Sequence, residues 1–128
     1  MHRFSSSLAA GRRDNLPLAS LSRTGLEKLF HSWLGASGRR YICSVYAVGA
    51  QPVFDRSRAV VAAVRRDGAH SQITFVFAPN PEDDDFAFWM ARARACGACE
   101  WHVHLLAATP EARAAILSDL APARRLAA

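Results

Sequence analysis

The chain of 128 residues lacks several features that would assign it to a class at once. No apolar run approaches the ~20 residues that a membrane-spanning helix needs, so we expect no membrane span. The three cysteines are an odd number, which argues against a disulfide framework and favours a reducing compartment. No secretory apolar core is present near the start, so we expect a cytoplasmic protein.

The signature motifs of large enzyme classes are also missing. The sequence contains no Gly-x-Ser-x-Gly elbow, no Gly-x4-Gly-Lys-Ser/Thr phosphate loop, no His-Glu-x-x-His zinc motif and no dinucleotide fingerprint. A non-catalytic protein is therefore favoured over an enzyme. We expect a small binding or regulatory module whose ligand the sequence does not name. The alternative is a metal-binding protein or a metal-dependent enzyme centred on His102 and His104.

The composition is that of a globular protein, with 51% apolar and 21% charged residues. Lys28 is the only lysine, and the arginine bias is typical of a high-GC genome. The net charge of +5 is unevenly spread, because residues 1–66 carry 11 basic and 3 acidic side chains whereas residues 67–128 carry 5 and 8. This asymmetry fits a nucleic-acid-associated protein that uses its basic N-terminal half. It also fits a protein partner, or head-to-tail self-association in which the basic half of one copy contacts the acidic half of the next. A solvated surface with biased codon usage explains it equally simply, and is favoured.

The chain divides into three segments by composition. Residues 1–21 mix serine, glycine, arginine and proline without sustained periodicity, which predicts a flexible leader. Residues 22–122 predict a single α+β domain, and residues 123–128 a C-terminal tail. The length fits one domain.

Helical signals occur at three places. Thr24 and Glu27 have capping-box spacing, and the apolar stripe that follows predicts a helix at about residues 25–34. Asn80 as cap and Pro81 at the first position predict a second helix ending near Cys96. Thr109 caps a third, which ends before Pro122.

Strand signals fall between these helices, at residues 40–48, 58–66, 72–78 and 100–106. Asp67-Gly68 predicts a hairpin between the second and third of them, although the alanine-rich run 58–66 is also compatible with a helix. The expected order is α-β-β-β-α-β-α, with a mainly antiparallel four-stranded sheet, beginning as a meander and packed by helices. The core is expected to include Trp33, Phe75, Phe77, Trp89 and Leu105.

One stretch concentrates potential metal ligands: Cys96, Cys99, His102 and His104 lie within nine residues. A dithiol redox centre is disfavoured, because such pairs open a helix and this pair closes one. His102 and His104 share one face of a strand, about 6.5–7 Å apart, and could chelate a divalent transition metal with Cys99, Glu100, His70 or His31 as third ligand. The alternative, that the two histidines face water or a covering side chain while their neighbours pack, is favoured, so no cofactor is expected.

A second candidate is the loop Gly35-Ala36-Ser37-Gly38-Arg39-Arg40. Its backbone amides and the guanidinium groups of Arg39 and Arg40 could wrap an anion. A helix stop followed by a turn explains the same residues and is favoured.

Overall fold

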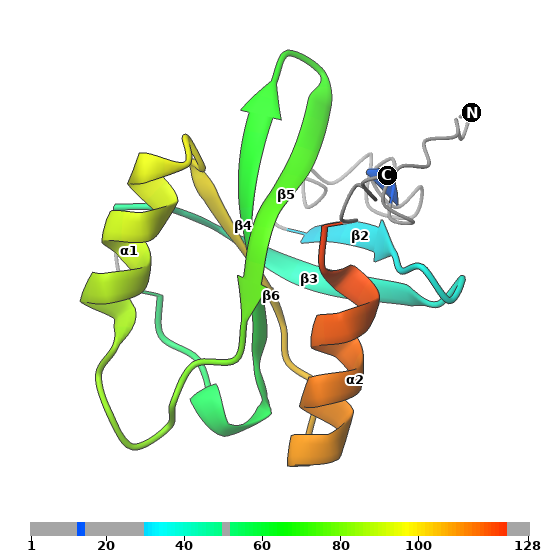
Figure 1. Cartoon of the computed structure of the whole chain (residues 1–128), viewed down its shortest axis with the longest axis vertical. Coiled ribbons are helices and arrows are strands. Elements are labelled where there is room, and N and C mark those ends of the chain that lie inside the picture. The colour runs from blue at the N-terminus through cyan, green and yellow to red at the C-terminus, as the bar shows by residue number, and fades with distance from the viewer. Residues whose placement is uncertain (1–12, 15–29, 50–51, 123–128) are drawn as a thin grey trace, which may run out of the picture.

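The computed structural model describes residues 13–14, 30–49 and 52–122, which form a small α+β domain (Figure 1). The α+β class predicted from the sequence is therefore confirmed. The strands are β1 (Arg13–Asp14), β2 (Phe30–Leu34), β3 (Arg40–Ala47), β4 (Val60–Asp67), β5 (His70–Phe77) and β6 (Glu100–His104), and the helices are a short 3-10 turn (Arg56–Arg58), α1 (Phe86–Ala95) and α2 (Pro110–Leu120).

All strands join one antiparallel sheet in the order β1-β2-β3-β6-β4-β5. The predicted count of four strands is wrong, since β2 and the two-residue β1 extend the sheet. The predicted meander also fails, because β6 inserts between β3 and β4 although it comes last in the chain. The sheet curls far enough that β1 at one edge contacts β5 at the other.

The first predicted helix is wrong where the structure describes it. Residues 30–34 form β2, which pairs with β3 from Phe30 opposite Ser44 to Leu34 opposite Arg40. The three central residues of β2 are all buried. A strand covered on both faces loses its alternating pattern, so its apolar residues can match helical spacing by chance. Residues 24–29, which include the expected capping box, lie outside the described residues.

The later elements follow the predictions more closely. The Thr109 side chain accepts a hydrogen bond from the Ala112 amide, with Pro110 at the first position of α2. By contrast, α1 starts at Phe86 rather than at Pro81. The Asn80 side chain instead accepts from the Glu82 amide at 2.8 Å, a local turn that competes with helix formation.

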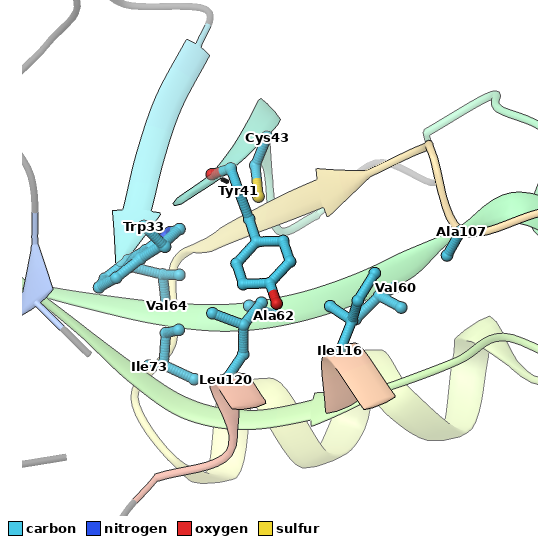
Figure 2. Close-up of a cluster of buried hydrophobic side chains, with 10 residues drawn as sticks. All are labelled: Trp33, Tyr41, Cys43, Val60, Ala62, Val64, Ile73, Ala107, Ile116 and Leu120. Atoms are coloured by element: carbon cyan, nitrogen blue, oxygen red, sulfur yellow. Dashed lines mark hydrogen bonds between the residues drawn. The ribbon is translucent and has the colours of Figure 1, made fainter. Parts of the chain in front are cut away.

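Each face of the sheet carries a helix and an apolar cluster, and α1 and α2 lie on opposite faces (Figure 1). Strand β4 contributes to both clusters, which explains its unbroken apolar run and the earlier ambiguity between strand and helix. Figure 2 shows the cluster beneath α2, made of Trp33, Tyr41, Cys43, Val60, Ala62, Val64, Ile73, Ala107, Ile116 and Leu120.

The cluster beneath α1 is the more aromatic of the two. It contains the predicted core residues Phe75 and Phe77, while Trp89 and Leu105 are half-buried against it. Trp101 of β6 has no solvent exposure, and its ring meets Phe77 and Phe86 edge-on, with both pairs of centroids 5.7 Å apart. The predicted core residues therefore all pack in the two clusters, with Trp33 in the cluster beneath α2, although Trp89 and Leu105 are only half-buried.

Neither helix in the described part of the chain is long and apolar enough to cross a membrane. Of the predicted leader, Arg13–Asp14 pair with β2. The rest of the leader and the predicted tail at 123–128 lie outside the described residues.

Candidate functional site

His102 occupies the centre of the only histidine cluster found among the described residues. It lies on β6 between β3 and β4, and it is fully buried. The indole Nε1–H of Trp33 donates to His102 Nδ1 at 2.8 Å. Since Nδ1 accepts, the neutral imidazole carries its proton on Nε2, which donates to Glu100 Oε1 at 2.9 Å.

Glu100 continues this chain of hydrogen bonds to the surface. Its second oxygen, Oε2, accepts from Arg66 Nε at 3.0 Å. Burial lowers the pKa of His102 to about 4. The hydrogen bond from His102, with help from Arg66, lowers the pKa of Glu100 to about 2. At neutral pH the network therefore holds a neutral imidazole and an ionised carboxylate.

Two other buried histidines are His31 on β2 and His104 on β6. The His31 ring lies 4.9 Å from both the Trp33 and the His102 rings. His104 Nδ1 donates to the carbonyl oxygen of Ile42 at 3.0 Å, and its ring meets Tyr41 edge-on at 5.3 Å. The sequence correctly placed His102 and His104 on one face. Of the candidate third ligands, His31 and Glu100 do lie beside His102. The sequence missed Trp33 as a neighbour because it assigned β2 to a helix.

The hydrogen bonds of the two histidines oppose metal binding at the predicted site. Both ring nitrogens of His102 are engaged, and His104 is bound through Nδ1. Cys99 is exposed, whereas both histidines are buried. Within residues 13–14, 30–49 and 52–122, no three His, Cys, Asp or Glu side chains gather in a way that could hold an ion. A metal at His102, His104 and Cys99 remains a prediction from the sequence alone.

Protein purified without a polyhistidine tag is expected to contain well under one equivalent of zinc, copper, iron or nickel. The reason is that His102 would have to give up the hydrogen bond from Trp33 or the one to Glu100 in order to coordinate an ion. Elemental analysis of the wild type beside His102→Ala and His104→Ala measures this. About one ion per chain in the wild type, lost in both variants, would establish the metal site instead.

The Cys-x-x-Cys segment, Cys96 to Cys99, follows α1 and leads into β6. Gly97 has a φ of 78°, and it donates to the Arg94 carbonyl while Ala98 donates to the Ala93 carbonyl. These two bonds make the helix C-terminus a Schellman motif, which requires the left-handed conformation that glycine supplies. The Cys99 backbone then bridges Val64 and Val48. The segment thus has a clear structural role, with both thiols, of Cys96 and Cys99, exposed at the surface.

The loop between β2 and β3 does bind a carboxylate, and that carboxylate belongs to the chain itself. Asp119 of α2 accepts from the Ser37 amide at 2.7 Å, from the Ser37 hydroxyl at 2.6 Å and from the Tyr41 hydroxyl at 2.6 Å. Although burial opposes ionisation, hydrogen bonds from Ser37 and Tyr41 lower the pKa of Asp119 below its usual value. This clamp fixes the C-terminal end of α2 to the sheet.

The side chains of Arg39 and Arg40 were the predicted anion ligands. Both residues are exposed, and the positive charge of Arg39 contributes to the lowered pKa of Asp119. The amides of Gly35, Ala36 and Gly38 donate to backbone carbonyls rather than to a ligand. Binding of an external anion by the two guanidinium groups remains a prediction.

Gly35→Ala is expected to destabilise the protein by about 1–3 kcal/mol, the usual range for overpacking. A Cβ at this position would lie 2.3 Å from Asp119 Oδ2 and 2.9 Å from Tyr41 Cε2, so the clamp would have to open. Urea denaturation measures the loss. Gly38→Ala is a comparison variant in the same loop: its Cβ would meet open space, so any loss of stability there comes from backbone strain at its φ of 91° and not from a clash. Equal stability of Gly35→Ala and the wild type would show that the clamp contributes nothing.

The groups suited to acid–base chemistry are thus engaged inside the fold, where they tie β2, β6 and α2 together. Comparison with known proteins adds no further assignment, since no family model, no curated protein and no solved structure matches the chain.

Proposed function

We propose that the protein is a non-catalytic binding module that contacts a protein partner through the outer face of α1. The observation that carries this proposal is the exposure of Phe88. Its side chain is 62% exposed on a helix of a small domain whose other large aromatic rings pack inward or against one another. An aromatic ring held in water by a rigid helix is the usual anchor of a protein interface.

The surroundings of Phe88 have the composition of an interface core. Its ring lies 4.9 Å from Trp89, which stacks on Phe77 at 4.2 Å and donates to Asp85 Oδ2 at 2.9 Å. The guanidinium of Arg92 lies 4.7 Å from the Phe75 ring centroid and 5.8 Å from that of Trp89. Aromatic residues and arginine are the residue types enriched at binding hot spots, and packing of this kind reduces the entropy lost on binding.

Charge favours a protein partner over nucleic acid for the described part of the chain. Residues 13–14, 30–49 and 52–122 carry ten arginines and ten carboxylates, so their formal charge is zero. The excess of +5 in the whole chain resides outside these ranges. A surface dedicated to phosphate backbones needs a local excess of positive charge.

Site-specific photocrosslinking in the source cells tests the proposal. A benzophenone amino acid at Phe88 is expected to yield a discrete adduct that mass spectrometry identifies, whereas the same probe at Glu111, exposed in the first turn of α2, yields none. The identified protein is then purified and titrated against the wild type and Phe88→Asp. Adducts equal at the two positions, or equal affinity for wild type and Phe88→Asp, would overturn the proposal.

A further inference from the structure

We propose that the partner of the α1 face is a second copy of this chain, with the two α1 helices packed antiparallel about a two-fold axis. This inference rests on the proposed function and names the partner. Two features of α1 favour this partner: the residues on its outer face and the charges at its two ends.

The outer face of α1 is apolar and closely approachable. Because successive residues turn by about 100°, the exposed positions fall on one side of the helix, opposite the buried Phe86 and Ala93. Small side chains beside one large ring allow two helix axes to approach to about 8–10 Å. The exposed apolar positions are Ala87, Phe88, Ala91 and Ala95.

The charges at the two ends of this face are opposite in sign. Glu82, Asp83 and Asp84 precede the helix and are exposed, while the exposed Arg92 and Arg94 lie in its last turns. The side chain of Asp84 is 70% exposed although it also approaches Arg56 at 3.6 Å. A surface that is negative at one end and positive at the other complements an identical surface turned end to end.

These end charges fit an antiparallel pair related by a two-fold axis. The acidic residues precede Phe86, the first residue of α1, whereas Arg92 lies in its last turns. In an antiparallel pair, the acidic end of one α1 therefore lies opposite the basic end of the other, and the same contact repeats across the axis. A two-fold interface needs this kind of self-complementarity. A partner with charge of a single sign would be repelled at one end of the face.

Analytical ultracentrifugation of the full chain tests the proposal first. The face of a ten-residue helix makes an interface at the small end of the range, so we expect a dimer populated at about 100 µM rather than at nanomolar concentration. Phe88→Asp should weaken dimerisation by about tenfold or more. Leu106→Asp is the matched control, because Leu106 is 74% exposed but lies beyond β6. It should leave the dimer intact.

A charge swap tests the antiparallel arrangement. The double variants Arg92→Glu/Arg94→Glu and Glu82→Arg/Asp84→Arg each place like charges across the axis, so each alone should be monomeric. Their mixture should form a heterodimer, because every contact across the axis then joins opposite charges. Circular dichroism checks that both variants remain folded, since Arg92 also packs on Phe75 and Asp84 approaches Arg56.

Several outcomes would overturn the inference. They are a wild-type monomer throughout the concentration range, a dimer that Phe88→Asp leaves unchanged, and folded charge variants that do not associate when mixed. Such results leave the proposed function standing if crosslinking at Phe88 captures a different protein. Both fail together only if Phe88 yields neither a dimer nor an adduct.

Discussion

Trp101→Ala is expected to lower the free energy of unfolding by about 3–5 kcal/mol, the usual cost of removing a large buried aromatic side chain. Trp101 has no solvent exposure, and its ring contacts Phe77 and Phe86 at the centre of the cluster beneath α1. Removing the indole leaves a cavity lined by the rings of Phe77 on β5 and Phe86 on α1. Urea denaturation at neutral pH measures the loss.

Two matched variants separate burial from simple loss of an aromatic ring. Trp101→Phe should cost much less than Trp101→Ala, because it keeps a ring and removes an indole N–H that has no hydrogen-bond partner among the described residues. Trp89→Ala should also cost less than Trp101→Ala, since Trp89 is only half-buried. If Trp89→Ala proved the more damaging of the two alanine variants, the order of burial in this core would be wrong.

The stability of the protein is expected to fall as the pH decreases from about 6.5 to about 4. In the unfolded chain the His102 imidazole takes up a proton near its ordinary value of 6.5, whereas in the fold burial lowers its pKa to about 4. The unfolded state therefore binds more protons in this window, so acid favours unfolding. A shift of this size corresponds to about 3 kcal/mol. The contribution is fully present above pH 6.5.

The hydrogen bond from Trp33 also disfavours protonation of His102, beside the main effect of burial. A protonated His102 would carry a proton on Nδ1, facing the indole N–H that now donates to it at 2.8 Å. Below pH 4.5 the lowered pKa of Glu100, about 2, extends the loss of stability further. Urea denaturation at a series of pH values measures both effects.

His102→Gln provides the control for this pH dependence. Its amide can donate to Glu100 and accept from Trp33 without titrating, so the variant should be less stable at pH 7 but should lose less stability between pH 6.5 and pH 4. The same slope in the wild type and in His102→Gln would assign the effect to other groups.

The sequence predicted the elements whose signals are local. The cap at Thr109 with Pro110, the hairpin at Asp67-Gly68 and the glycine that closes α1 each depend on the conformation of a few neighbouring residues. Such signals do not depend on which strands lie side by side. The face shared by His102 and His104 is also local, since side chains two residues apart on a strand point the same way.

Tertiary structure alone decided the rest. Residues 30–34 become a strand because β3 offers a pairing partner and both faces are covered. Strand β6 lies between β3 and β4, where it forms hydrogen bonds with both strands. The residues that form the candidate site are also far apart in the sequence: 69 positions separate Trp33 from His102, and 82 separate Ser37 from Asp119. A single sequence records which side chains can donate, accept or pack. Which of them meet is determined by long-range strand pairing, and no local pattern carries that information.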